Sequence, residues 1–303
     1  MISIIAPTYN RFEIVEETIL KIISIDLEFE LIIVNDGEKL PFSISHPKLK
    51  ILENPKRGAA SARNFGASHA KYDILFFIDD DMWITAESLQ AIEKLRQQQF
   101  FITNCTILNW RYPDYLLTKM KNEKIGRYLL NSNYHNLEGR LKQKINKNEI
   151  FMRITSIGSG SFAISKETLE MVGKYNDNIT FQGEDIEISS NLNKHLIPIL
   201  LYIPITCFHN QKDRLDIKGY LDREQRGYFS QFQNNNLSFK PNKIKQIIFS
   251  FLIPFNTLFL LLFNILPNKP QYDRIIFRTI GTLTSIAYFK AWYKAKNLPS
   301  TFF

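Results

Sequence analysis

The apolar run DILFFI at residues 73–78 is followed by three adjacent carboxylates, Asp79, Asp80 and Asp81. Such a run is typical of a buried strand. Carboxylates at its end repel one another and lose hydration on burial unless a cation binds them. Such a cluster usually binds a hard divalent ion, which one or two of the carboxylates hold and whose coordination a diphosphate completes. A solvated acidic turn after a strand is the alternative.

Two arginines could meet anionic groups. Arg57 and Arg63 flank the small-residue string GAASA at residues 58–62. Small side chains let a helix approach a ligand closely, and guanidinium groups bind phosphate or carboxylate oxygens. The pair predicts contact with a nucleotide or with the aspartates, and a structural ion pair to Asp79 or Asp81 is the alternative.

The elements that would position these residues alternate in period over the first hundred residues. Apolar runs are separated by two helical patterns, which begin near Phe12 and Gly58. This alternation predicts an α/β fold of βαβ units, with a mostly parallel sheet flanked by helices. Ligands bind at the carboxyl ends of such strands, so Asn10, Asp36 and the aspartates at 79–81 should converge on one crevice.

The middle of the chain has fewer apolar runs. Residues 109–150 are rich in Asn, Lys and Tyr, which favours a partly helical insertion that faces the second substrate. A strand is predicted over RITSIGSGSFAIS at 153–165, followed by a helix with Ser165 as its N-cap. A helix after Gly183 and a strand at 197–204 complete this part.

The pattern becomes helical from about Asp216 to the end. We therefore predict a catalytic domain over residues 1–215. Its first part, 1–108, would bind the nucleotide, and 109–215 would supply the acceptor side. Residues 216–303 would form a helical C-terminal appendage.

Six short blocks along the chain match a known family in its own order. They are APTYNR at 6–11, IVNDG at 33–37, NPKRGAASARN at 54–64, IDDDM at 78–82, GSGSFAIS at 158–165 and GEDIE at 183–187. Together they resemble family 2 glycosyltransferases. The resemblance implies a Rossmann-like sheet of the GT-A type, which binds a nucleotide-sugar together with Mg²⁺ or Mn²⁺.

The resemblance also implies a role for individual residues on the donor side. Asp36 would accept a hydrogen bond from the base, typically uracil, although Asp36 and Gly37 also fit an ordinary turn. Asp79 would lie near the ribose, and Gly160 would let the backbone pass close to the donor sugar. The expected nucleotide-sugar contacts are Pro7, Thr8, Tyr9, Arg11, Asp36, Arg57, Arg63, Asp79, Asp80 and Gly160.

On the catalytic side, the resemblance implies that Asp81 is the direct metal ligand and Asp185 the base, with Glu184 positioning the acceptor. A helix start by itself also favours carboxylates at 184 and 185. His209 is expected to complete the metal shell, with a structural histidine as the alternative. An inverting transfer needs one base to deprotonate the attacking hydroxyl, and the metal stabilises the departing diphosphate.

The charge of +8 lies entirely in the C-terminal part of the chain. From Lys240 onward there are nine Lys/Arg residues and one acid, Asp273, so residues 1–239 are neutral. This distribution argues against nucleic acid and for an anionic membrane surface, contacted through residues 240–303. Residues 247–266 are uncharged and could just span a bilayer. Spanning would place Lys290, Lys294 and Lys296 on the far side, so a monotopic or re-entrant anchor is favoured. A spanning helix, or a helix buried in a homodimer, is the alternative.

The two cysteines, Cys105 and Cys207, form neither a disulfide framework nor a CxxC pair, and we expect both to be buried small hydrophobes. No secretory signal precedes the first strand-like run. These features predict a protein at the cytoplasmic face of the cell membrane. We expect it to transfer a sugar, most often from a UDP-sugar in this family, to a hydroxyl of a surface glycan or lipid-linked saccharide in polysaccharide biosynthesis. The alternative is a catalytically inactive sugar-nucleotide-binding partner in an assembly complex.

Overall fold

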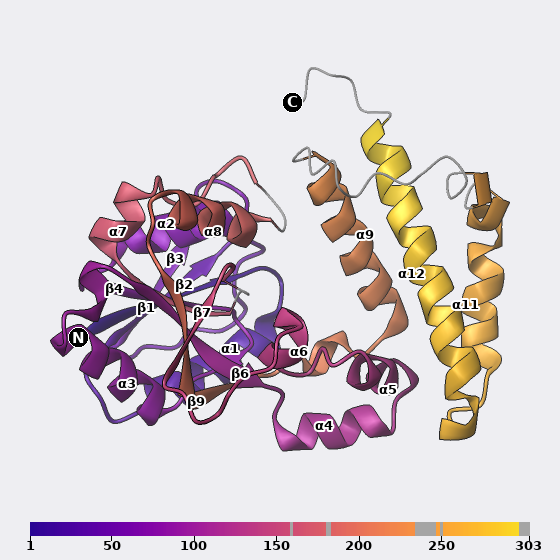
Figure 1. The fold of residues 1–303 in the computed structure, drawn as a ribbon, viewed down its shortest axis with the longest axis horizontal. Coiled ribbons are helices and arrows are strands. Elements are labelled where there is room, and N and C mark those ends of the chain that lie inside the picture. The colour runs from indigo at the N-terminus through magenta and orange to yellow at the C-terminus, as the bar shows by residue number, and fades with distance from the viewer. Residues whose placement is uncertain (158–159, 180–182, 234–246, 249–250, 297–303) are drawn as a thin grey trace. The chain divides into compact units, whose positions relative to one another are not determined.

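The computed structural model describes the chain except residues 158–159, 180–182, 234–246, 249–250 and 297–303 (Figure 1). By its internal contacts the chain divides into two compact units. The first, here called the catalytic unit, contains residues 1–113, 135–180 and 184–210. The second, the C-terminal unit, contains residues 114–134, 181–183 and 211–303, so a segment of the expected acceptor side groups with the C-terminal helices.

The catalytic unit is built on one sheet whose first four strands are parallel. Strands β1 (Ile2–Thr8), β2 (Glu30–Asn35), β3 (Leu49–Glu53) and β4 (Ile74–Ile78) lie in the order β3-β2-β1-β4. Nearly every side chain of β1, β2 and β4 is buried, as expected for strands covered on both faces. The parallel half of the sheet is therefore the part that the alternating sequence pattern predicted.

The other half of the sheet is mixed, so the prediction of a mostly parallel sheet was wrong. Strand β8 (Ser161–Ser165) runs antiparallel to β4 and to β6 (Cys105–Arg111). β9 (Ile199–His209) is parallel to β6 but antiparallel to both β5 (Met82–Trp83) and β7 (Phe151–Ile154). Parallel pairing needs a crossover between successive strands, and the later strands are not joined by such regular βα units. The single strand expected over 153–165 is likewise two strands, β7 and β8, with different partners.

Helices cover the sheet because each carries an apolar stripe or small side chains on one face. Helix α1 buries Ile14, Val15, Ile19 and Ile22. In α2, Gly66 lies so close to β1 that an added Cβ would come within 2.5 Å of Ile5. The helices of the catalytic unit are α1 (Phe12–Ile23), α2 (Ala59–His69), α3 (Ala86–Gln97), α6 (Leu137–Leu141), α7 (Lys166–Met171) and α8 (Glu184–Lys194).

Local capping agrees with the sequence. The Ser165 side chain accepts a hydrogen bond from the Thr168 backbone N–H, which confirms the predicted N-cap of α7. Thr85 and Ser88 form a capping box at the start of α3. The predicted helix after Gly183 is α8, which begins at Glu184.

The C-terminal unit is helical in its described residues. Its helices are α4 (Asp114–Lys121), α5 (Lys124–Asn131), α9 (Ile217–Gln233), α11 (Asn256–Ile265) and α12 (Asp273–Lys296). Figure 1 shows α12 running beside α9 and α11. Within the described part of the chain, no helix has both the length and the apolar character required to cross a membrane.

Candidate functional site

The aspartates follow β4 in a tight turn that leads directly into the two-residue strand β5. The Met82 backbone N–H donates to the Asp79 carbonyl at 3.1 Å, which closes the turn. β5 then pairs with the end of β9, with Met82 opposite His209. The Asn210 backbone N–H donates to the Asp81 carbonyl at 2.7 Å. Strand pairing thus holds Asp81 next to His209, two residues far apart in the sequence.

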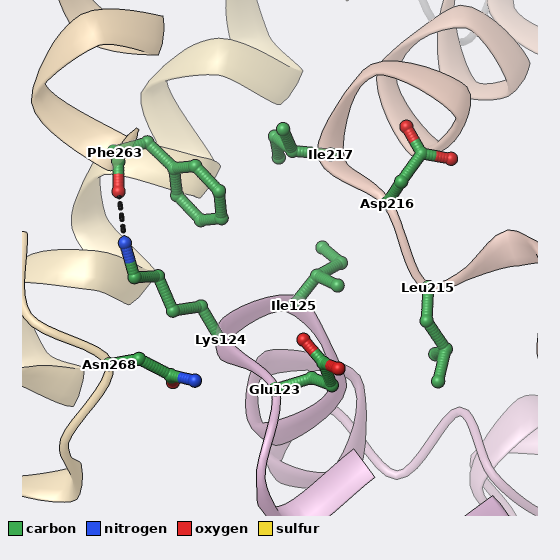
Figure 2. A pocket seen from close by; sticks show the side chains of 8 residues that line it. All are labelled: Glu123, Lys124, Ile125, Leu215, Asp216, Ile217, Phe263 and Asn268. Atoms are coloured by element: carbon green, nitrogen blue, oxygen red, sulfur yellow. Dashed lines mark hydrogen bonds between the residues drawn. The ribbon is translucent and has the colours of Figure 1, made fainter. Parts of the chain in front are cut away.

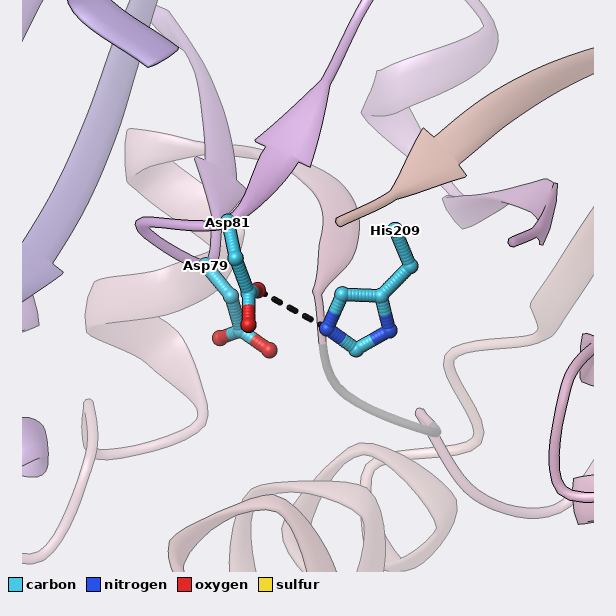
Figure 3. A group of neighbouring side chains, drawn as sticks. All are labelled: Asp79, Asp81 and His209. Atoms are coloured by element: carbon cyan, nitrogen blue, oxygen red, sulfur yellow. Dashed lines mark ion pairs between the residues drawn. The ribbon is translucent and has the colours of Figure 1, made fainter. Parts of the chain in front are cut away.

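Two carboxylates and an imidazole converge at this point (Figure 3). Asp79, Asp81 and His209 each offer one ligand atom, and these atoms all lie within 4.8 Å of one another. Nε2 of His209 is 2.8 Å from Oδ1 of Asp81, and both side chains are buried. The rings of Trp110 and Tyr112 pack nearly perpendicular to the histidine ring, with centroids 4.9 and 5.9 Å away. The imidazole is therefore fixed in orientation by its surroundings.

This donor set fits a divalent cation. Carboxylate oxygens and one imidazole nitrogen are ligands that Mn²⁺ accepts, and carboxylate oxygens suit Mg²⁺. Asp79 keeps about a quarter of its side-chain surface exposed (26%), whereas that of Asp81 is fully buried. The cluster is consequently open to solvent on the Asp79 side.

Arg11 is the cation closest to two of the aspartates. Its Nη2 atom lies 2.8 Å from Oδ2 of Asp81, and its Nη1 atom pairs with Asp80. Asp80 also accepts a 2.8 Å hydrogen bond from the Thr8 hydroxyl. Arg11 and Thr8, both expected to contact the donor, thus contact the aspartates. The guanidinium group provides part of the positive charge that three adjacent carboxylates require.

Arg63 connects the aspartate turn to the start of α8. It donates to Glu184 at 2.8 Å and to Asp79 at 3.2 Å, and its guanidinium lies over the Tyr175 ring. The ion pair with Asp79 that the sequence left as an alternative is present. Burial disfavours the charged guanidinium, but attraction by Glu184, Asp185, Tyr175 and Asp79 outweighs it and raises the pKa of Arg63. Arg63 is therefore charged at every accessible pH.

The first turn of α8 presents the two carboxylates predicted for catalysis. Glu184 is buried against Arg63, whereas Asp185 is half-buried. Ser189 donates to the Asp185 backbone carbonyl and accepts from the Ile157 N–H at 2.9 Å, which fixes this turn to the loop before β8. Glu184 thus forms an ion pair with Arg63. The negative charge of Asp185 lies near enough to Arg63 to contribute to the raised pKa of the guanidinium.

Gly160 lies beside Asp79 for a steric reason. Its φ is +108°, a conformation that favours glycine, and an added Cβ would come within 3.2 Å of the Asp79 Oδ2 atom. The first two residues of the motif, 158–159, lie outside the described residues. A glycine at 160 therefore allows the loop before β8 to approach the aspartate turn.

The residues expected at the nucleotide base lie at the ends of β1 and β2. The Asp36 carboxylate accepts from the Gly58 N–H at 3.1 Å and from the Asn54 side chain at 2.6 Å. Asn54 was not singled out from the sequence, although it begins one of the six motif blocks. These bonds fix the carboxylate between the end of β2 and the N-terminus of α2.

An aromatic side chain and a guanidinium form an exposed surface next to Asp36. Tyr9 is 44% exposed, and the Arg57 guanidinium carbon lies 5.3 Å from the centre of its ring. Pro7, two residues earlier on β1, is half-buried. Tyr9 and Arg57 could stack on a base and approach a phosphate, respectively.

The pocket drawn in Figure 2 belongs to the C-terminal unit alone. Its volume is about 180 Å³, and it is lined by residues of α5, α11 and the start of α9. The Lys124 ammonium in its wall donates to the Phe263 carbonyl at 2.6 Å and to the Asn264 carbonyl at 3.2 Å. Among the described residues that line it, the cation is Lys124, which holds α5 against α11, and we assign the pocket no ligand.

Comparison with known proteins identifies the family of this chain. The model of glycosyl transferase family 2 matches residues 3–171, more than half of the chain. The chain therefore belongs to glycosyl transferase family 2, and the predicted family is confirmed.

Individual relatives are similar over smaller regions. An uncharacterised glycosyltransferase of Haemophilus influenzae is 35% identical over 103 residues, which cover 32% of this chain and 35% of the relative. The uncharacterised glycosyltransferase EpsJ of Bacillus subtilis is 28% identical over 114 residues, covering 35% and 33%. The chain thus matches about a third of the length of each of these relatives.

Among solved structures, GalNAc-T7 with UDP, GalNAc and Mn²⁺ superposes with a TM-score of 0.52 at 16% identity. The match covers 69% of this chain and 43% of that one. At this level of identity the likeness concerns the fold. It is consistent with the expected GT-A type.

Proposed function

We propose that this protein is an inverting, metal-dependent glycosyltransferase that moves a sugar from a nucleoside diphosphate donor to an acceptor hydroxyl. One observation carries the proposal: Asp79, Asp81 and His209 converge within 4.8 Å at the carboxyl end of β4, in a chain of family 2. Open α/β sheets bind their ligands at this edge.

Asp81 and His209 would hold a Mg²⁺ or Mn²⁺ ion, with Asp79 on the solvent side. When bound there, the ion would supply positive charge for the departing diphosphate. The similar fold of GalNAc-T7, whose structure contains UDP, GalNAc and Mn²⁺, supports this assignment. Arg57 would approach the phosphates, and Tyr9 and Asp36 would contact the base, for which uracil is our proposal.

Asp185 would accept the proton of the attacking hydroxyl. A half-buried carboxylate at a helix start has the access that a general base needs, and inversion requires only one such group. Glu184 has a different part: its ion pair with Arg63 holds the first turn of α8 in place. We propose a hydroxyl of a surface glycan or lipid-linked saccharide as the acceptor.

The test is a donor screen that measures release of UDP, GDP and dTDP from their sugar conjugates. It uses the full chain with Mn²⁺, with Mg²⁺ or with EDTA, and with saccharide and lipid-linked acceptors. We expect UDP release that needs both metal and acceptor. Donor binding by calorimetry, without release from any donor–acceptor pair, would instead support the alternative of an inactive sugar-nucleotide-binding partner.

A further inference from the structure

Helix α11 presents an apolar stripe to solvent. Leu258, Leu261, Leu262 and Ile265 recur at helical spacing and lie on one face, and three of them are more than half exposed (57%, 53% and 69% for Leu258, Leu261 and Ile265). Phe255, at the N-cap, is also exposed. The opposite face packs on the C-terminal unit through the buried Phe263. Contiguous apolar surface of this kind marks an interaction site.

Basic side chains border the C-terminal end of this stripe. Lys269, Arg274 and Arg278 are exposed in the turn after α11 and in the first turns of α12. The one acid among them, Asp273, is held by Arg127 at 2.8 Å and so contributes little negative charge to the border. An apolar stripe with a cationic border complements a surface of acyl chains beneath anionic headgroups.

We infer that the α11 face docks this protein on anionic lipid membranes, with the leucines in the headgroup–acyl boundary and the basic border at the headgroups. Helix α11 has ten residues and is about 15 Å long, which suits a helix lying along the interface. A second copy of the chain is a poorer occupant, because an identical face carries the same cationic border and so offers no complementary negative charge. The inference does not depend on transfer activity.

The test is flotation of the full chain with vesicles of phosphatidylcholine, alone or mixed with phosphatidylglycerol. We expect binding to the anionic vesicles that weakens with salt. K269Q and R274Q should each reduce the affinity about fivefold. The double variant L258E/I265E should reduce it more than about tenfold, because both side chains would leave the apolar boundary.

The control is Ile102→Glu, which places one glutamate at an apolar side chain that is 67% exposed in the catalytic unit. It should bind vesicles like the wild type, and circular dichroism melting curves should show that all variants fold. Equal binding by wild type and L258E/I265E would overturn the inference. A second result would also overturn it: the wild type fails to bind vesicles and sediments as a dimer, and L258E/I265E sediments as a monomer. That result would show that the α11 face joins two copies of the chain.

Discussion

Arg63 and Glu184 form a 2.8 Å ion pair between Nη1 and Oε1 that joins helix α2 to the first residue of helix α8. Both side chains are buried, with 6% and 9% of their surfaces exposed. The same guanidinium reaches Asp79, so the donor turn and the proposed base helix share one cation. Geometry on the two sides of the site is therefore coupled through Arg63.

Glu184→Gln should destabilise the fold by about 2 kcal/mol. Loss of one partner from a buried ion pair costs ~3–5 kcal/mol, and Arg63 retains Asp79 as a counter-charge, which moderates the loss. Urea unfolding measures the free energy. The control is Glu170→Gln, which removes the exposed pair of Glu170 with Lys174 and should cost less than about 0.5 kcal/mol. Equal losses of unfolding free energy in the two variants would show that the buried ion pair stabilises the fold no more than the exposed one.

Asp185→Asn should reduce kcat by roughly 10²- to 10⁴-fold, because the amide cannot take the proton of the acceptor hydroxyl. The side chain keeps its shape, so donor affinity measured by calorimetry should stay within about twofold of the wild type. Asp26→Asn, at an exposed aspartate in the loop before β2, is the control and should leave kcat unchanged. If Asp185→Asn retains wild-type turnover, another group is the base.

Asp81→Ala should abolish metal-dependent turnover, with a loss on the order of 10³-fold, since a bound ion supplies several kcal/mol of charge stabilisation. It should also abolish the rise in Tm that Mn²⁺ produces in the wild type, because the ion binds only the folded state. Glu28→Gln, an exposed acid in the loop before β2, serves as the control. A Mn²⁺-induced Tm rise that persists in Asp81→Ala would place the ion elsewhere.

Two glycines with positive φ, one directly before β8 and one shortly after α7, form a matched pair. Gly160 (φ +108°) lies beside Asp79, whereas a Cβ on Gly173 (φ +90°) would meet nothing within 4 Å. Alanine at either position should cost about 1–2 kcal/mol in backbone strain, measured by urea unfolding. Only Gly160→Ala should also lower kcat/KM, because its methyl group would displace the Asp79 carboxylate. Equal activity of the two variants would argue against a role for this close approach.

The buried thiols predict a loss of stability at high pH. Burial raises the pKa of Cys105 and of Cys207 to about 12. Unfolded thiols ionise near pH 8.5, so above that pH the unfolded state releases protons that the folded state keeps. The contribution of the two thiols to the free energy of unfolding is thus fully present below pH 8.5. Between pH 8.5 and pH 12 each cysteine lowers this free energy by ~1.4 kcal/mol for every pH unit.

Urea unfolding from pH 7 to 10 measures this dependence. Cys105→Ala and Cys207→Ala should each remove the slope due to one thiol, whatever their effect on stability at pH 7. An unchanged slope in both variants would contradict the assignment. The expectation from the sequence that both cysteines are buried is confirmed.

The sequence predicted those parts of the fold that follow from local periodicity. Alternating runs correctly indicated β1, α1, β2, α2 and β4, because each pattern reflects burial of the element itself. Ser165 could be identified as a cap because capping is also local. Convergence of the strand ends then followed from the general geometry of parallel sheets.

Long-range pairing was not predictable in the same way. Strand β6 is buried on both faces and lies at the start of a region with a polar composition, so no period marked it. Whether Arg11 would meet a phosphate or Asp81 depends on the distance between β1 and β5, which no local pattern encodes. The contact between Arg63 and Glu184 likewise depends on where α8 begins relative to α2.

The pairing of β5 with β9 has a consequence for how the protein is made. The aspartates are synthesised early, but His209 and the backbone N–H of Asn210 that fix Asp81 belong to a strand that leaves the ribosome much later. A nascent chain that has emerged only to residue 171 contains the whole family match and yet lacks Glu184, Asp185 and His209. During translation, the acidic turn therefore lacks its contacts with His209 and Asn210 at first. The group of Asp79, Asp81 and His209 is complete only after β9 has joined the sheet.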